Sequence, residues 1–197
     1  MFITLEGVDG SGKSTQAAML VQELGPRTIA LREPGGTDAA ERIRWLLADP
    51  EAPLDPLAEL LLFCAARADL VSRVIRPALE RGRTVVCDRF ADSTVAYQGV
   101  ARGLGIVKVR ELSEIATDGL APDLTILLEV DPAVGLGRAR SDDRFEAEGL
   151  RFQQLVAEGY ADIARREPQR VVVIDGDGSP EEVHRRVMEV VEARLAR

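Results

Sequence analysis

The stretch GVDGSGKS, which runs from Gly7 to Ser14, decides the fold of this chain. It matches the pattern G-x-x-x-x-G-K-[ST] at every fixed position. An apolar run, Phe2–Glu6, precedes the stretch, and Ser14–Leu24 after it repeats apolar residues at helical spacing. A strand, a glycine-rich loop and a helix in this order predict a loop whose backbone N–H groups bind phosphate.

Further short runs rich in Ile, Val, Leu and Thr lie along the chain without alternating polar residues. Such runs predict strands that are covered on both faces. They are Thr28–Arg32, Thr84–Asp88, Leu124–Val130 and Val171–Asp175. Helical patterns separate the runs, so the sequence predicts an α/β fold with a five-stranded parallel sheet flanked by helices.

Three helices are predicted to start at a capping residue followed by proline, at Asp55-Pro56, Asp131-Pro132 and Ser179-Pro180. Glu182 completes a capping box with Ser179. The helical stretch that starts at Pro56 continues to about Arg81. We expect it to be kinked or split near Pro77, because proline has no N–H to donate.

Composition bounds the class of protein. The 197 residues are 46% hydrophobic and 29% charged, which predicts one domain over 1–197. The net charge of −8 argues against a nucleic-acid partner. No apolar run approaches the roughly 20 residues that span a bilayer, and no secretory signal is evident, so we expect no membrane partner and a cytoplasmic location. Cys64 and Cys87 are expected to be buried free thiols.

The counts of lysine and asparagine limit which kinds of nucleotide-binding protein the chain can be. Of 25 Lys and Arg residues, only Lys13 and Lys108 are lysines, and the chain has no Asn. An Asn-Lys-x-Asp guanine signature is therefore excluded, and the short chain favours a small-metabolite kinase over an ATP-driven motor. Lys13 would reach the β- and γ-phosphates, and the Ser14 hydroxyl would ligate Mg²⁺.

Charged residues follow two of the predicted strands, at the sheet edge where α/β folds bind ligands. Asp88 ends the run Thr84–Asp88 and Arg89 follows it, and Arg32 ends the run Thr28–Arg32 and Glu33 follows it. An aspartate in this position is typical of a Mg²⁺ ligand, and an arginine can bind phosphate bidentately. The alternatives are a helix cap for Asp88 and a surface ion pair for Arg89.

Other residues suit a nucleoside. Phe63 and Arg67 lie four positions apart on a predicted helix, so a ring and a guanidinium could stack on a base and bond its edge. Thr94, Tyr97 and Gln98 also share one helix face, and their polar groups suit a sugar and a base edge. Taken alone, Phe63 is more typical of a core residue, and Tyr97 is equally consistent with packing.

Five segments together resemble the thymidylate kinase family in that family's order and spacing: EGVDGSGKST, REPGGT, FCAAR, DRFADSTVAYQG and PDLTILLEVDP. The similarity runs from about Phe2 to the last helix. The resemblance implies a P-loop nucleoside monophosphate kinase fold with a short lid. It also implies transfer of a phosphoryl group from MgATP to dTMP, a step in dTTP synthesis, and a homodimer built on helices that include the one carrying Phe63.

The resemblance also implies a role for each site residue. The ATP phosphates would contact Gly7, Val8, Asp9, Gly10, Ser11, Gly12, Lys13, Ser14 and Thr15. The nucleotide dTMP would contact Arg32, Glu33, Phe63, Arg67, Arg89, Ser93, Thr94, Tyr97 and Gln98. Phe63 would stack on thymine, Arg67 would bond its edge, and Tyr97 would disfavour a 2′-hydroxyl. Lys13, Asp9 and Arg89 would act in catalysis, and Ser14 and Asp88 would hold Mg²⁺.

A charged segment, Gly137–Gly149, carries Arg138, Arg140 and Arg144, whereas the phosphate loop has no basic residue before Lys13. This resembles the bacterial type of the family, in which lid arginines reach the transferred phosphoryl group, and all three arginines are catalytic candidates. The alternative is a solvated run of charges with internal salt bridges. Arg138 and the residues after Asp175 are also candidates for contacts with adenine.

Two other functions stay open from the residues. A deoxynucleoside kinase would need a carboxylate base after the second strand, where Glu33 lies, but Arg32 and Arg89 favour an acceptor that already carries phosphate. A non-catalytic nucleotide-binding regulator would not need the intact set of Lys13, Ser14 and Asp88.

Overall fold

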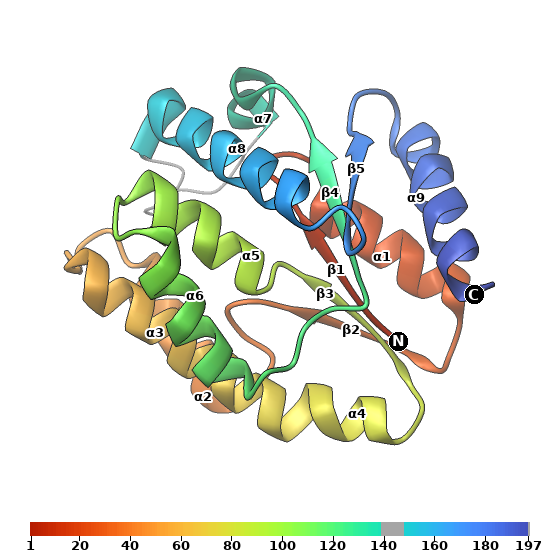
Figure 1. Ribbon diagram of the computed structural model, residues 1–197, viewed down its shortest axis with the longest axis horizontal. Coiled ribbons are helices and arrows are strands. Elements are labelled where there is room, and N and C mark those ends of the chain that lie inside the picture. The colour runs from red at the N-terminus through yellow and green to blue at the C-terminus, as the bar shows by residue number, and fades with distance from the viewer. Residues whose placement is uncertain (139–147, 197) are drawn as a thin grey trace.

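The computed structural model describes residues 1–138 and 148–196. Five parallel strands form one sheet in the order β2-β3-β1-β4-β5, with helices on both faces (Figure 1). The strands are β1 (Phe2–Glu6), β2 (Thr28–Arg32), β3 (Thr84–Asp88), β4 (Leu124–Glu129) and β5 (Val171–Asp175). The predicted α/β class and the parallel five-stranded sheet are confirmed.

Helical segments connect the strands. The α-helices are α1 (Lys13–Leu24), α2 (Asp38–Ala48), α3 (Pro56–Leu70), α4 (Arg76–Glu80), α5 (Ala91–Thr94), α6 (Ile106–Thr117), α7 (Pro132–Arg138), α8 (Gly149–Arg166) and α9 (Pro180–Leu195). Two further segments are π-helical, η1 (Val71–Ile75) and η2 (Val95–Ala101). The expected break of the long helix is confirmed, since η1 lies just before Pro77, whose nitrogen cannot donate to the preceding turn.

The expected helix starts are confirmed by their hydrogen bonds. Asp55 accepts from the Leu57 N–H, Asp131 accepts from the Ala133 N–H, and Ser179 forms the predicted capping box with Glu182. These caps satisfy N–H groups that have no partner within the helix.

The two edge strands differ from the expectation that every strand is covered on both faces. In β2 and β5 the buried residues are interrupted by more exposed ones, and Val173 on β5 is 44% exposed. An edge strand has a neighbour on one side only, so fewer helices lie over it. The fourth strand also ends one residue earlier than predicted, at Glu129.

Register brings the strand ends together. The central strand β1 pairs Leu5 with Asp88 of β3, and β2 pairs Arg32 with the same Asp88. The carboxyl ends of β1, β2 and β3 therefore meet at one edge of the sheet. The phosphate loop and both predicted strand-end charges lie at this edge, where ligands bind in open α/β sheets.

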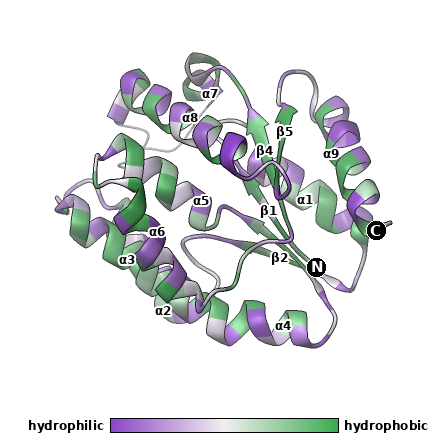
Figure 2. Ribbon diagram, in the orientation of Figure 1, coloured by the Kyte–Doolittle hydropathy of each residue, from purple (hydrophilic) through white to green (hydrophobic). Residues whose placement is uncertain are grey.

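Each face of the sheet has its own hydrophobic core. Helices α1 and α9 pack on one face, where Leu20 and Val187 meet Ile3 and Leu5 of β1. Segments α3, η2, α6 and α8 cover the other face (Figure 1). Figure 2 shows hydrophobic residues along the strands and hydrophilic stripes along the helices. Both cysteines are buried and free, as expected. No described helix is long and apolar enough to span a membrane.

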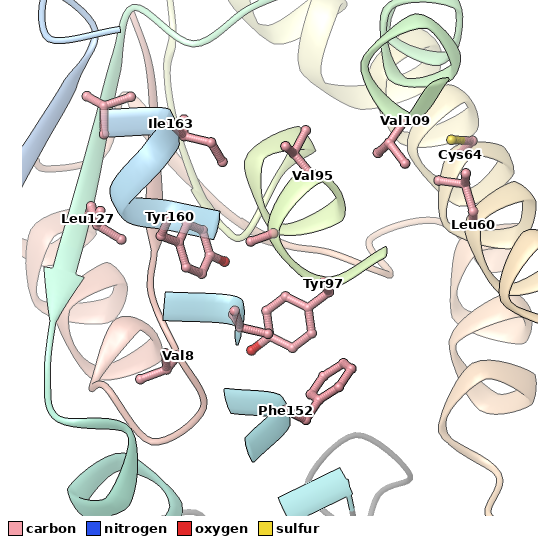
Figure 3. Packing of buried hydrophobic residues seen from close by; sticks show 13 residues of the cluster. Val8, Leu60, Cys64, Val95, Tyr97, Val109, Leu127, Phe152, Tyr160 and Ile163 are labelled. Atoms are coloured by element: carbon pink, nitrogen blue, oxygen red, sulfur yellow. The ribbon is translucent and has the colours of Figure 1, made fainter. Parts of the chain in front are cut away.

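Aromatic residues of η2 and α8 lie at the end of one core, close to the phosphate loop. The ring of Tyr97 packs edge-on against Phe152 and Tyr160, with centroids 5.9 Å and 6.5 Å apart (Figure 3). Val8 of the phosphate loop belongs to the same cluster. This packing fixes the polar ends of both tyrosines beside the loop.

Candidate functional site

The phosphate loop links β1 to α1, as the sequence predicts. Gly7, Gly10 and Gly12 all have positive φ angles, which glycine adopts without strain. A Cβ at Gly7 would lie 2.6 Å from the carbonyl oxygen of Leu128, so a larger residue does not fit there. The loop and the first turn of α1, from Gly10 to Gln16, line one cleft together with Gly176 and Gly178.

Lys13 folds back onto this loop. Its Nζ donates to the carbonyl oxygen of Val8 at 2.7 Å and to Ser11 Oγ at 3.2 Å, and the residue is buried. Burial and the neighbouring Arg89 lower the pKa of Lys13 to about 8. The ammonium is therefore held at the loop by neutral oxygens, which a phosphate can replace as partners.

Ser14 and Asp88, the two predicted Mg²⁺ ligands, are brought together. The Ser14 hydroxyl donates to Asp88 Oδ2 across the start of α1 and the end of β3. Hydroxyl and carboxylate oxygens are the ligands that Mg²⁺ prefers, and the ion usually takes its other ligands from water and phosphate. Within 1–138 and 148–196, no cluster of three or more His, Cys, Asp or Glu residues could hold a metal ion.

Arg89 connects the phosphate loop to the helices above it. Its φ of 69° is unusual for a residue with a side chain. One terminal nitrogen, Nη2, forms an ion pair with Asp9 and donates to the Tyr97 hydroxyl at 3.1 Å. The other, Nη1, donates to Ser93 Oγ and to the Tyr160 hydroxyl. The guanidinium is thus fixed between four elements before any ligand arrives.

Asp9 is held from both sides. Gln153 of α8 donates to Asp9 Oδ2, and Tyr97 donates to Asp9 Oδ1 at 2.9 Å. Burial alone would raise the pKa of Asp9, but Arg89 and Lys13 outweigh burial and keep that pKa below its usual value. The carboxylate is therefore charged at neutral pH and available as a hydrogen-bond acceptor.

Glu6 supports Arg89 from behind and is fully buried. Its carboxylate accepts from the Phe90 N–H at 2.8 Å, from Ser93 Oγ at 2.6 Å and from the Tyr160 hydroxyl at 2.8 Å. Burial and the charge of Asp92 raise the pKa of Glu6 to about 7. Because the two hydroxyls donate to Glu6, their oxygens are left to accept from Arg89.

Sequence reasoning missed Glu6, Gln153 and Tyr160 as site residues. A carboxylate at the end of a buried strand was an available signal for Glu6. Gln153 and Tyr160 lie on α8, more than a hundred residues from the phosphate loop, and only the packing of that helix brings them to Asp9 and Arg89.

A cavity beside this network collects most of the residues predicted to bind the second nucleotide. It is lined by Asp9, Glu33, Phe63, Arg67, Arg89, Ser93, Thr94, Tyr97 and Gln98, together with residues that include Arg44 and Leu47 of α2. Sequence reasoning missed these two α2 residues, because no motif marks them. The predicted common face of Thr94, Tyr97 and Gln98 is confirmed, although they span the junction of α5 and η2.

Arg67 is a buried cation at this cavity, 1% exposed. Its Nε donates to Glu33 Oε2 at 2.8 Å, and its Nη2 donates to Thr94 Oγ1 at 2.8 Å and to the Phe90 carbonyl oxygen at 3.1 Å. Within the described residues, Nη1 has no hydrogen-bond partner. An unsatisfied buried N–H is costly, so this nitrogen is suited to meet a ligand oxygen.

Arg32 does not line this cavity. Its side chain is 55% exposed and pairs with Glu41 at 3.0 Å. It lies instead in an adjoining cleft that also contains Lys13, Asp88 and Arg89. The predicted pair Arg32 and Arg89 therefore shares a cleft, but only Arg89 also reaches the nucleoside cavity.

Arg138, at the end of α7, lines the cleft of the phosphate loop together with Gly176 and Gly178, so the two stretches suggested for adenine lie together. Its guanidinium lies 3.8 Å from Asp177. The other predicted lid arginines, Arg140 and Arg144, lie outside the described residues, as does most of the segment 137–149.

Similarity to known proteins agrees with this geometry. The family model described as thymidylate kinase matches residues 5–187, most of the chain. The chain belongs to the thymidylate kinase family. A thymidylate kinase from Synechococcus sp. (strain JA-2-3B'a(2-13)) is 52% identical over 198 residues, covering 99% of this chain and 96% of that protein.

Other thymidylate kinases extend the match. The one from Deinococcus radiodurans is 46% identical over 200 residues, covering 98% of this chain and 97% of that protein. The crystal structure of thymidylate kinase from Ehrlichia chaffeensis is 36% identical, covers 97% of this chain and 98% of its own, and superposes with a TM-score of 0.79. The resemblance inferred from five sequence segments is therefore confirmed, and so is the P-loop nucleoside monophosphate kinase fold.

Proposed function

We propose that this chain is an ATP-dependent nucleoside monophosphate kinase that phosphorylates dTMP to dTDP. The observation that carries the proposal is the position of Arg89 and Asp9. Both line the nucleoside cavity and also the cleft that contains Lys13 and Asp88. A phosphate on an acceptor nucleotide in the cavity would point toward a phosphate donor held by the loop, which phosphoryl transfer requires.

On the donor side, residues Gly7–Thr15 would bind the ATP phosphates and Lys13 would place its ammonium between them. Ser14 and Asp88 would hold Mg²⁺, which neutralises phosphate charge when bound. The acceptor is already a phosphate oxygen anion, so catalysis needs positioning and positive charge rather than a strong base. Arg89 and Arg32 would supply that charge at the acceptor phosphate.

On the acceptor side, Phe63 would stack on thymine and Arg67 would use its Nη1 on the base edge. Asp9, fixed by Gln153, would accept a hydrogen bond from the sugar, and the ring of Tyr97 would pack against the deoxyribose. Glu33 supports this assignment indirectly, because its ion pair with Arg67 holds the guanidinium in place.

Three finer assignments rest on the sequence and on family resemblance. They are a single kinase domain over 1–197 with a lid at 137–149, catalysis by one or more of Arg138, Arg140 and Arg144, and a cytoplasmic location. The homodimer has structural support as well. Helices α2, α3 and α6 are neighbours and carry exposed apolar side chains, among them Trp45, Leu57, Leu61 and Ile115.

A coupled assay of ADP release tests the reaction. We expect turnover with ATP and dTMP, and no turnover with thymidine. Turnover with thymidine alone would instead identify a deoxynucleoside kinase, and binding of both nucleotides without turnover would identify a regulator. The geometry disfavours a deoxynucleoside kinase, because the Glu33 carboxylate that would serve as its base is buried against Arg67.

A further inference from the structure

Gln98 in the nucleoside cavity has an amide whose orientation is fixed from behind. Its Nε2 donates to Glu59 Oε1 at 2.8 Å, and both residues are 1% exposed. A side-chain amide can normally flip, which exchanges the positions of its oxygen and its nitrogen. A carboxylate accepts hydrogen bonds and does not donate them, so the nitrogen of Gln98 must face Glu59.

The other end of that amide is consequently an acceptor. Gln98 lines the cavity, and no donor from 1–138 or 148–196 reaches its Oε1. Arg67 contributes the opposite group to the same cavity, since its buried Nη1 is a donor that no described residue satisfies. The cavity thus presents one fixed donor and one fixed acceptor.

This pair complements one class of base. The imide edge of thymine or uracil carries a carbonyl oxygen next to an N–H, which matches a donor next to an acceptor. Cytosine carries an amino group next to an unprotonated ring nitrogen, so both contacts would be reversed. A mismatch of this kind leaves buried polar groups unpaired, which costs more than a lost hydrogen bond.

The position of the Glu59 carboxylate is itself fixed by an arginine. Arg102, the residue after η2, donates to both Glu59 carboxylate oxygens at 3.3 Å. It also forms an ion pair with Glu148, just before α8. The guanidinium of Arg102 lies over the Phe152 ring at 4.9 Å, which fixes it in place. The Glu59 carboxylate is therefore fixed where it accepts the hydrogen bond from Gln98 Nε2.

We propose that Glu59 is a positioning residue for base specificity. By orienting the Gln98 amide, it makes the cavity selective for nucleotides with an imide base and against those with a 4-amino base. This inference rests on the proposed function, because it assumes that the cavity binds the pyrimidine of the acceptor nucleotide.

The test is Glu59→Gln, with affinities for dTMP, dUMP and dCMP measured by calorimetry. An amide at position 59 can donate as well as accept, so the side-chain amide of Gln98 is free to flip. We expect the preference for dTMP over dCMP to fall by about tenfold or more, since a tenfold change corresponds to roughly 1.4 kcal/mol and an unpaired buried group costs about that much. The preference for dTMP over dUMP should not change, because both carry the imide.

Asp92→Asn is the matched control. Asp92 is another buried carboxylate paired with an arginine, but it binds Arg170 and Thr125 and does not line the cavity. We expect this variant to keep both preferences. If Glu59→Gln does not fold, the double variant Glu59→Gln, Arg102→Gln removes both charges and allows the same measurement.

Two outcomes would overturn the inference. In one, the variant keeps the wild-type preference for dTMP over dCMP. In the other, affinities for all three nucleotides fall in proportion, which would assign Glu59 a purely structural role. Failure of the proposed function would be seen separately, as an absence of dTMP turnover by the wild-type chain.

Discussion

The phosphate loop and the nucleoside cavity lie at the same edge of the sheet but are built differently. The loop takes its residues from one continuous stretch, Gly7–Thr15, and its shape comes from glycines and backbone groups. The cavity takes side chains from the end of β2, from α2 and α3, and from the α5–η2 segment. Two buried carboxylates orient its polar groups: Glu33 accepts from Arg67, and Glu59 accepts from Gln98.

This difference separates two ways of making a binding site. A backbone cradle needs few side chains and tolerates any donor of similar phosphate chemistry. A cavity of fixed side chains depends on many contacts between distant segments, and it can discriminate between bases that differ in one hydrogen-bonding group. Variants on the two sides should therefore affect different kinetic parameters.

The largest effect is expected for Lys13→Ala on the loop side. Removing a cation that meets charge in the transition state costs roughly 10²- to 10³-fold in kcat. The melting temperature should change little, because within the described residues the Lys13 ammonium hydrogen-bonds only to oxygens of the loop. Turnover and thermal melts check this, and an unchanged kcat would contradict the assignment of the loop as the donor site.

A smaller and more selective effect is expected for Phe63→Ala on the cavity side. Loss of stacking on a base costs about 1 to 3 kcal/mol, which corresponds to roughly 5- to 150-fold in affinity. The KM for dTMP should rise by this amount and the KM for ATP should stay near its wild-type value. Equal increases in the two KM values would mean that the cavity is not the base site.

The smallest effect is a pH dependence of the loop side. The pKa of Lys13 is lowered from 10.5 to about 8 by burial and by Arg89, so the free protein loses this cation as pH rises through about 8. Since kcat/KM reports the groups of the free enzyme, kcat/KM for ATP should fall roughly fourfold between pH 7 and pH 8.5.

Lys13→Arg is the control, because arginine keeps its charge throughout this range. Its residual kcat/KM should show no such decline. A decline of the same size in that variant would assign the pH dependence to another group.

Much of the fold was predictable because its signals are local. Each strand was marked by a short apolar run, and the helix starts were marked by caps such as Asp55 and Ser179. The exposure of the edge strands was not predictable, since strand order depends on which runs pair and not on their composition. Val173 is as apolar as its neighbours, yet its place on an edge strand leaves it exposed.

The same distinction applies to the site. The loop, Asp88 and Arg89 were identified from motifs, and Phe63, Arg67 and Gln98 from helical spacing together with family resemblance. The supporting residues were missed, because Glu6, Glu59 and Tyr160 act through other side chains and carry no motif. Their partners are defined only once α3, α8 and η2 have packed together.

The central place of β1 in the sheet has a consequence for synthesis on the ribosome. Its partners, β3 and β4, begin at Thr84 and Leu124, and the Phe2 N–H bonds to Asp123. At about 5 to 20 residues per second, roughly 80 residues take about 4 to 16 s to add. For those seconds the apolar strand that leads into the phosphate loop has no sheet neighbour, and the nascent chain presents it as a segment for chaperones to shield.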